Sequence, residues 1–459
     1  MIPFESAFVV GALPSGLYAA LYLHDHGVEV FVSESKQRSA DEKFELAVLL
    51  LERAGIPFEF GQNTPDIMTR FDAVVVSPGV PPEAPIMVAA ARAGKFIAGE
   101  TEIAAYAGLS VLAVTGSNGK STTTALLGAI VAQEHPRVVT GGNLGTPVSQ
   151  LLVEHPSAGP AVLEVSCFQL ETIHEFHPKV ALFSNLVPNH LDRYGAMERY
   201  FATKKRLFEN MTADDAIVLN WDDPALRELG PTLCSRVFYF SLGDGAFPGV
   251  HLADGVIVFK DGATCVELFR ETDLRVPGRH NVANAMSAAL AAFLYGVSPG
   301  SIQRAVAGFN GLPHRLENAG TSHGVTFVND SKATTPESVM TAVDAMSGAY
   351  VVILGGSSKD VSFDKMARHL AGDKNLEMAI VMGATGSEIE DSLRRAGMKR
   401  IVRVGSLEEA VGTGVQLLPA GGTLLLSPAC ASFDMFRDFE QRGDRFKEIV
   451  QSAFGATMR

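Results

Sequence analysis

The stretch from Leu109 to Glu134 limits the fold more than any other part of the sequence. An apolar, β-branched run ends at Thr115, a turn bracketed by glycines follows at 116–119, and Lys120 and Ser121 open an alanine- and leucine-rich segment. This order predicts a buried strand, a loop and a helix N-terminus. Backbone N–H groups and the helix dipole can bind phosphate oxygens there, Lys120 can neutralise a terminal phosphate, and the Ser121 hydroxyl can hold Mg²⁺. We therefore predict a nucleoside triphosphate site.

The predicted loop departs at one position from the common G-x-x-x-x-G-K-[ST] pattern. Val114 stands where that pattern has its first glycine, which leaves the shorter G-x-x-G-K-S. A glycine turn before an ordinary helix is the alternative interpretation. The strand and the helix on either side favour the phosphate site, because a phosphate loop needs both.

Length and charge restrict the possible classes of protein. The chain has 459 residues, so about three domains are expected. Its net charge of −13 gives it no basic field that would capture nucleic acid or an anionic membrane. We expect small-molecule partners bound at local sites, with no nucleic acid and no membrane, and we expect a monomer.

The cysteines and the N-terminus indicate the compartment. Four cysteines show no C-x-x-C spacing, which favours reduced thiols over a disulfide framework or a zinc site. The first five residues lack the basic region and cleavage signature of a signal peptide. The longest apolar helix that we expect, around 283–297, is too short to span a bilayer. We therefore expect a cytoplasmic protein.

The first part of the chain has a Rossmann-like opening. Residues 6–11 predict a buried strand, and a loop at 11–16 leads into a helix. Leu13 replaces the second glycine of the dinucleotide fingerprint, so the loop alone leaves a structural turn and a nucleotide site equally open. A second strand at 72–80 stops in a Ser-Pro-Gly turn, which we expect at the same edge of the sheet. That coincidence favours ligand binding.

The second part carries chemistry-bearing residues close to strand ends. Glu164 interrupts an apolar strand expected at 161–171, and a buried carboxylate is costly unless a cation or hydrogen bonds compensate it. We predict a metal there rather than a surface glutamate on an edge strand. His190 and Asp192 are expected at the end of a strand, although a lone histidine is more often an ordinary loop residue. The next helix carries Lys204.

The remaining chain predicts a β-rich continuation and then a third domain. Residues 213–270 have strand character, and a small-residue helix follows with Asn281 and Asn284 in its first turn. These amides can face a nucleotide or can serve as ordinary helix caps. From near Leu312 strands alternate with helices again. We predict three α/β domains at 1–98, 99–311 and 312–459.

Several motifs together are similar to those of the Mur ligases, the ATP-dependent amino-acid-adding enzymes of peptidoglycan synthesis. The matching stretches are T-G-S-N-G-K-S (115–121), G-G-N-L-G (141–145), L-E-V-S-C-F-Q-L-E (163–171), N-H-L-D-R-Y (189–194), Lys204, P-G-R-H-N (277–281), P-H-R (313–315) and N-D-S-K-A-T (329–334). Within the family, the tail S-P-A-C-A-S-F-D-M-F-R-D-F-E-Q-R-G-D-R-F resembles the branch that adds D-glutamate. The first domain matches least, because Ser33-Glu34-Ser35 stands where the family tends to carry an Asp-Thr-Arg-like turn.

The resemblance implies a Rossmann-like N-terminal domain, a central phosphate-loop ATPase-type domain and a Rossmann-like C-terminal domain. It also implies the site residues. ATP would be bound by Gly116, Asn118, Gly119, Lys120, Ser121, Asn281, Arg315 and Asp330. Two Mg²⁺ ions would be held by Ser121, Glu164, His190 and Lys204, the last as a carbamate formed with CO₂. The UDP substrate would contact Pro14, Ser15, Ser77, Gly79, Asn143 and Gln169. D-Glutamate would contact Thr334, Lys359, Ser427 and Phe433.

The implied reaction adds D-glutamate to UDP-N-acetylmuramoyl-L-alanine through an acyl phosphate, with Lys120, His190 and Lys204 as catalytic residues. Other ATP-driven ligases that share the loop, such as the L-alanine-adding enzyme or folylpolyglutamate synthase, are alternatives that Lys359 and the S-P-A-C-A-S-F-D stretch disfavour. A phosphate-loop switch or motor would leave the first domain without a role. A dinucleotide-dependent oxidoreductase is disfavoured by Leu13.

Overall fold

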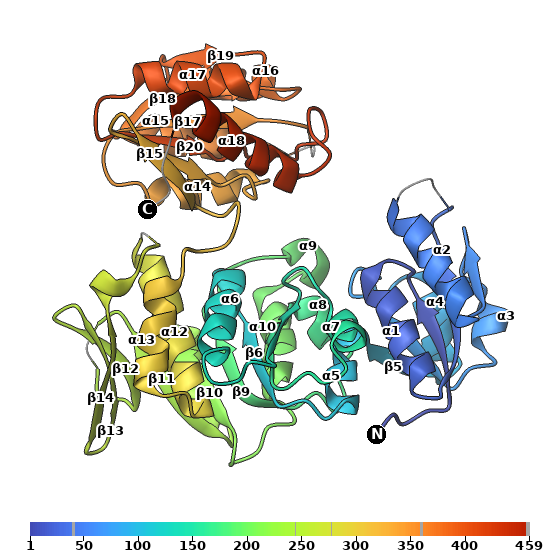
Figure 1. Ribbon diagram of the computed structural model, residues 1–459. Helices are drawn as coiled ribbons and strands as arrows, with labels where there is room; N and C mark the ends of the chain where they lie inside the picture. The colour runs from blue at the N-terminus through green and yellow to red at the C-terminus, as the bar shows by residue number, and fades with distance from the viewer. Residues whose placement is uncertain (39–41, 244, 277, 359–360, 456–459) are drawn as a thin grey trace. The chain divides into compact units, whose positions relative to one another are not determined.

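We describe a computed structural model of the chain, which covers residues 1–38, 42–243, 245–276, 278–358 and 361–455. Three sheets with flanking helices run through these residues (Figure 1). The chain forms two compact units, one of residues 1–274 with 280–308 and one of 275–279 with 309–459. Among the described residues, no helix combines the length and the apolar character needed to cross a bilayer.

The first sheet is parallel and has the order β3-β2-β1-β4-β5. Its strands are β1 (Ser6–Val10), β2 (Glu29–Glu34), β3 (Phe58–Phe60), β4 (Ala73–Val76) and β5 (Phe96–Gly99). Its helices are α1 (Pro14–Asp25), α2 (Glu42–Ala54), α3 (Pro65–Met68) and α4 (Pro85–Arg92). β1 and β4 are almost wholly buried because side chains cover both faces. This is the Rossmann-like arrangement predicted from the sequence.

The second sheet has the order β14-β13-β12-β11-β10-β9-β6-β8-β7. Its strands are β6 (Val111–Thr115), β7 (Val139–Gly142), β8 (Ala161–Glu164), β9 (Pro178–Phe183), β10 (Ala216–Asn220), β11 (Arg236–Ser241), β12 (Gly249–Ala253), β13 (Val256–Asp261) and β14 (Thr264–Arg270). Along the sheet, β12, β11, β10, β9, β6, β8 and β7 pair in parallel. β13 and β14 continue it beyond β12 as antiparallel strands. The β-rich continuation expected at 213–270 is therefore confirmed.

The helices that flank the second sheet are mostly short. They are α5 (Ile103–Tyr106), α6 (Lys120–Val131), α7 (Val148–Glu154), α8 (Cys167–Leu170), α9 (Leu191–Tyr194), α10 (Met197–Lys205), α11 (Pro224–Leu229), α12 (Arg279–Tyr295) and α13 (Pro299–Gly308). Single 3₁₀ turns lie at Glu100–Glu102, Arg206–Phe208, Gly230–Thr232 and Glu271–Asp273. Helix α6 begins at Lys120, after the loop at 116–119 that follows β6, as the loop sequence predicts.

Buried carboxylates join the first sheet to the second. Glu102 accepts the backbone N–H groups of His174, Glu175 and Phe176 at 2.8–3.0 Å. Glu100 accepts both the backbone N–H and the hydroxyl of Ser149, in the first turn of α7, at 2.7 and 2.8 Å. Both carboxylates are essentially inaccessible to solvent. One hydrophobic cluster also continues from the first sheet into the second.

The second unit contains the third sheet, in the order β15-β16-β20-β17-β18-β19. Its strands are β15 (Glu317–Ser322), β16 (Val325–Asn329), β17 (Tyr350–Gly355), β18 (Leu376–Met382), β19 (Ile401–Arg403) and β20 (Thr423–Leu426). Its helices are α14 (Pro336–Asp344), α15 (Asp364–Gly372), α16 (Gly386–Arg395), α17 (Leu407–Leu417) and α18 (Phe439–Phe454). β15 is antiparallel to β16 and the other strands are parallel. Two apolar clusters, one on each face, form its core.

Three predicted elements differ in their bounds. The strand expected at 161–171 ends at Glu164, because Ser166 and Gln169 form a capping box that starts α8. The strand expected at 72–80 is confined to β4 and stops before Ser77. His190 does not stand at a strand end, since β9 ends at Phe183 and His190 directly precedes α9.

Candidate active site at the phosphate loop

The phosphate loop is folded by its own backbone and by the end of β9. The hydroxyl of Ser184 and the side-chain amide of Asn185 donate to the carbonyl of Asn118, while the Asn118 N–H donates to the Asn185 side-chain oxygen at 2.8 Å. Gly119, with φ +79°, is the N-cap of α6. A Cβ at Gly119 would lie 2.4 Å from Oδ1 of Asn284, so the loop and α12 leave no room for a side chain there.

This contact brings α12 to the loop. Asn284 lies against Gly119, and its side-chain nitrogen donates to Oδ1 of Asn281 at 3.3 Å. Both asparagines are more than nine-tenths buried. The sequence allowed either nucleotide binding or helix capping for these two asparagines. In the structure they lie beside the phosphate loop.

Two lysines converge on one carbonyl oxygen. Nζ of Lys120 donates to the carbonyls of Gly116 and Ser117 at 3.0 and 2.9 Å. Nζ of Lys204, on α10, donates to the same Gly116 carbonyl at 2.9 Å and to the Thr115 hydroxyl at 3.2 Å. Lys204 is 1% exposed. Burial, and next the positive charge of Lys120, lower the pKa of Lys204 to about 7. Lys204 therefore loses its proton more readily than an exposed lysine does.

Glu164 lies at the end of β8, next to the phosphate-loop strand. Its Oε1 accepts the side-chain amide of Asn143 at 2.7 Å, and its backbone carbonyl accepts the Asn143 N–H. Its Oε2 is buried and has no hydrogen-bond partner among the described residues. A buried carboxylate oxygen without a hydrogen-bond partner is costly unless a cation or a proton binds it. The predicted metal ligand Glu164 and the predicted substrate residue Asn143 are thus in direct contact.

Aromatic rings surround the predicted catalytic histidine. The His190 ring lies 4.8 Å from the Phe168 ring and 6.4 Å from the Tyr200 ring, centroid to centroid. Its φ of +52° is unusual for a residue other than glycine and marks local backbone strain. The Tyr200 hydroxyl lies 3.1 Å from the Ser117 hydroxyl, which links this cluster to the phosphate loop. The side chain of Asp192 lies outside the described part of the chain.

The predicted UDP-binding residues lie at the carboxyl edge of the first sheet. Pro14 and Ser15 begin α1, and the Ser77 N–H donates to the Val10 carbonyl at 3.1 Å. A Cβ on Gly11 would lie 2.5 Å from the Ser77 hydroxyl oxygen. The loop after β1 and the Ser-Pro-Gly turn, which includes the exposed Gly79, therefore meet as predicted.

Glu34 joins this group, although the sequence did not single it out as a site residue. Its side chain accepts the N–H groups of Ala12 and Lys36 at 3.0 and 2.9 Å, and only 7% of it is exposed. Its place at the end of β2 is the signal that could have identified it. Gln169, by contrast, uses its side-chain oxygen in the capping box with Ser166.

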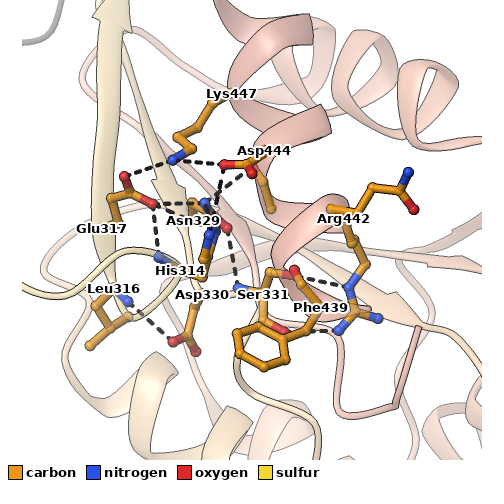
Figure 2. A network of polar contacts seen from close by, with 12 residues as sticks. His314, Leu316, Glu317, Asn329, Asp330, Ser331, Phe439, Arg442, Asp444 and Lys447 are labelled. Carbon is orange, nitrogen blue, oxygen red and sulfur yellow. Dashed lines mark hydrogen bonds and ion pairs between the residues drawn. The ribbon is translucent and has the colours of Figure 1, made fainter. Parts of the chain in front are cut away.

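The second unit gathers polar groups at the ends of β16 and β20. Asp330 accepts the Leu316 N–H at 3.1 Å, as Figure 2 shows, and also accepts the Ser427 hydroxyl at 2.8 Å. Burial raises the pKa of Asp330 to about 7. Arg315 precedes Leu316 and acts on Asp330 through its charge. Ser427 is fully buried behind Asp330, so its hydroxyl supports that carboxylate.

The other predicted D-glutamate residues are placed less uniformly. Thr334 is half-buried before α14. The Phe433 ring is 74% exposed, and its backbone N–H donates to the Ser357 hydroxyl at 3.0 Å. Lys359 lies outside the described residues.

A strand, loop and helix of this kind, with lysines directed at the loop, define a phosphate-loop enzyme that uses a nucleoside triphosphate. Family models agree with that class and narrow it. A Mur ligase MurD-like N-terminal domain matches residues 5–99, a Mur ligase middle domain matches 114–292, and a Mur ligase glutamate ligase domain matches 314–430. The chain belongs to the Mur ligase family.

Relatives of known name match almost the whole chain. The UDP-N-acetylmuramoylalanine--D-glutamate ligase of Acidobacterium capsulatum is 39% identical over 98% of this chain and 97% of its own length. The ligase of the same name from Pelotomaculum thermopropionicum is 38% identical over 98% of each. Among solved structures, UDP-N-acetylmuramate-alanine ligase MurC of Thermotoga maritima has a TM-score of 0.60 at 22% identity, covering 98% of this chain and 100% of that one. This likeness supports the three-domain fold.

Proposed function

We propose that the chain is an ATP-dependent ligase that joins D-glutamate to UDP-N-acetylmuramoyl-L-alanine in peptidoglycan synthesis. The convergence of Lys120 and Lys204 on the Gly116 carbonyl, beside the phosphate loop, is the observation that carries the proposal. A carboxylate is a poor acyl donor, so ATP must first convert it to an acyl phosphate. The D-glutamate amine then attacks the acyl carbon, forms the amide bond and releases phosphate. Both steps concentrate negative charge where the lysines lie.

The residues near the loop fit Mg²⁺. Oε2 of Glu164 is buried without a hydrogen-bond partner among the described residues, and Ser121 supplies a hydroxyl in the first turn of α6. No group of three or more His, Cys, Asp and Glu side chains in the described chain could hold a metal by itself. Glu164, Ser121, His190 and Lys204 would hold two ions, with Lys204 as a carbamate because an ammonium cannot be a ligand. Mg²⁺ there would neutralise charge on the transferring phosphoryl group.

The remaining roles are proposals for individual residues. Lys120, in the first turn of α6 beside the loop, would bind the terminal phosphate of ATP. His190 either holds metal or accepts a proton from the attacking amine. Asn281, Arg315 and Asp330 position the nucleotide. We propose domains at 1–98, 99–311 and 312–459, a monomer, and a cytoplasmic location.

The two amino-terminal sites orient the other substrate. Pro14, Ser15, Ser77 and Gly79 would contact the UDP group, and Asn143 and Gln169 the muramoyl-alanine arm. Thr334, Lys359, Ser427 and Phe433 would form the D-glutamate site. The Ser427 hydroxyl, which donates to Asp330 in the structure, would turn to D-glutamate when that substrate binds.

A coupled assay of phosphate release tests the function. Purified protein, ATP, Mg²⁺ and UDP-N-acetylmuramoyl-L-alanine are mixed with one amino acid from a panel. We expect release that depends on both the nucleotide sugar and D-glutamate. Equal release with L-alanine or glycine would contradict the specificity and leave the ligase chemistry standing. Release that requires no amino acid would favour a simple nucleotide hydrolase.

A further inference from the structure

A buried arginine in the first turn of α18 belongs to none of the sites above. Arg442 is 1% exposed and is the largest fully buried side chain among the described residues. No carboxylate of the described residues lies within 4.0 Å of its guanidinium. Burial lowers its pKa to about 10. Asp434 acts on Arg442 through its charge, but burial is the larger effect. A buried charge is costly, so the hydrogen bonds that the guanidinium forms must offset much of that cost.

All of those hydrogen bonds go to two loops at the carboxyl edge of the third sheet. Nε donates to the Ser331 hydroxyl at 2.9 Å and Nη2 to the Ser331 carbonyl at 2.8 Å, as Figure 2 shows. Nη2 also donates to the Cys430 carbonyl at 3.0 Å, and Nη1 to the Ala431 carbonyl at 3.3 Å. Ser331 follows β16, and Cys430 and Ala431 follow β20. One side chain thus fixes the ends of two neighbouring strands.

The same guanidinium reaches the end of a third strand. A Cβ on Gly356, just after β17, would lie 3.1 Å from Nη1 of Arg442 and 2.1 Å from the Ala431 carbonyl oxygen. That carbonyl also accepts the Ser357 N–H at 2.9 Å. Strands β16, β20 and β17 are adjacent in the sheet. The planar guanidinium, with its divergent N–H groups, therefore binds the loops after β16 and β20 directly, and the Ala431 carbonyl connects it to the loop after β17.

The neighbouring residue makes this placement possible. Gly443 packs against His314, and a Cβ there would lie 2.1 Å from Nδ1 of the imidazole. Asn329, at the end of β16, donates to the Gly443 carbonyl at 3.2 Å and to Glu317 at 2.9 Å. Figure 2 shows Arg442 and this second group on either side of the segment 329–331. The start of α18 is thus held at a fixed depth against the sheet edge.

We propose that Arg442 is a positioning residue for the amino-acid site. It fixes the loop after β16, which leads to Thr334, and the loop after β20, which carries Ser427 and Phe433, so it sets the distances between these proposed D-glutamate groups. The inference rests on the proposed function for its substrate. An alternative is that Arg442 only stabilises the fold. A structural residue of that kind would change stability without changing one Michaelis constant selectively.

The test compares Arg442→Met with Arg445→Met. Both replace an arginine of α18 by an apolar chain of similar length, but Arg445 is half-exposed and pairs with Glu408 and Glu448 on the surface. In Arg442→Met we expect the KM for D-glutamate to rise at least about 10-fold, with the KM values for ATP and the UDP substrate within about 2-fold. In Arg445→Met all three should stay within about 2-fold. Arg442→Lys keeps the positive charge but loses the several N–H groups of the planar guanidinium, so it should give an intermediate KM for D-glutamate.

Hydrogen exchange provides a readout that does not depend on the substrate. Amides of 330–334, 355–358 and 428–433 should exchange faster in Arg442→Met, or in Arg442→Lys if the methionine variant does not fold, while those of α14 and α15 keep their rates. Unchanged exchange in those loops, or equal rises in all three KM values, would overturn the positioning role. Faster exchange in an enzyme whose wild type does not use D-glutamate would overturn the proposed substrate and leave the positioning role standing.

Discussion

Both units place a buried cationic side chain at the carboxyl ends of parallel strands, but the groups around that side chain differ between the two units. At the phosphate loop, Lys120 and Lys204 share the Gly116 carbonyl, and their mutual repulsion contributes to the lowered pKa of Lys204. In the other unit, Arg442 alone meets carbonyls and a hydroxyl from the strand-end loops. The first arrangement brings like charges together, and the second distributes one charge over several acceptors.

The difference separates a reactive site from a supporting one. While both lysines are unmodified amines, an anion that binds between them relieves their repulsion. Once Lys204 carries the proposed carbamate, Lys120 alone supplies the positive charge for phosphoryl transfer. The arginine already has acceptors in the folded chain and gains less from an added anion. Replacing a lysine should therefore affect catalysis more than stability, whereas replacing a supporting group should affect one substrate or the stability alone.

The sharpest test of this contrast is Lys120→Ala. We expect a loss of about 10³-fold or more in kcat, because the ammonium neutralises the transferring phosphate. The melting temperature should stay the same or rise, since one of two repelling charges is removed. Phosphate-release kinetics and thermal unfolding measure both. A folded variant with near-normal turnover would remove ATP from the mechanism described above. Lys205→Ala, at an exposed lysine on α10, is the control for loss of a lysine outside the phosphate loop and should keep its activity.

A slightly smaller effect is expected for Lys204→Ala. Without an oxygen ligand at this position, activity should fall at least about 100-fold, and short carboxylic acids such as acetate should restore part of it by supplying the missing oxygens. Mass spectrometry of the native wild-type protein in bicarbonate should show the added mass of CO₂. Normal activity in the variant would assign Lys204 a structural role in the loop.

Lys359→Ala should act on one substrate. We expect the KM for D-glutamate to rise about 10-fold or more, with smaller changes for ATP and the UDP substrate, because the ammonium would anchor the side-chain carboxylate. Initial-rate measurements with each substrate varied in turn give the comparison. Lys365→Ala, also in the second unit, serves as the control. Equal effects on all three substrates would place Lys359 outside the amino-acid site.

The smallest effect concerns stability and pH. Because the pKa of Asp330 is raised from 3.8 to about 7 in the folded chain, the folded state binds more protons than the unfolded state between those values, so stability falls as pH rises through this window. Asp330→Asn removes the dependence. The Tm of the variant minus that of the wild type should therefore increase between pH 4.5 and pH 8. Asp364→Asn, at an exposed carboxylate, should show no such trend, and a constant difference for Asp330→Asn would contradict the pKa.

The sequence predicted the architecture well because its signals are local. The strand before Gly116, the helix after Lys120 and the alternation of strands and helices depend on short-range pattern. Bounds failed where side chains intervene, as when the Ser166–Gln169 capping box ends the strand expected to continue to residue 171.

The site was predicted only in part from the sequence. Glu164, Asn143 and the lysines were named, but their contacts join residues far apart in the chain, and periodicity carries no information about such contacts. Arg442 reads as one charge among several on an amphipathic helix. Only the packing of α18 against the strand ends shows that it is buried.

The carboxylates of Glu100 and Glu102 turn what is by position a linker into part of a folded core. Linkers between domains usually tolerate insertion and exchange, because few contacts depend on their register. Here one inserted residue would turn the Glu102 carboxylate away from the backbone N–H groups of His174, Glu175 and Phe176. The first domain can therefore be exchanged between relatives only if the segment 99–103 stays with the second sheet, since separating Glu100 and Glu102 from their partners would leave buried polar groups without hydrogen bonds.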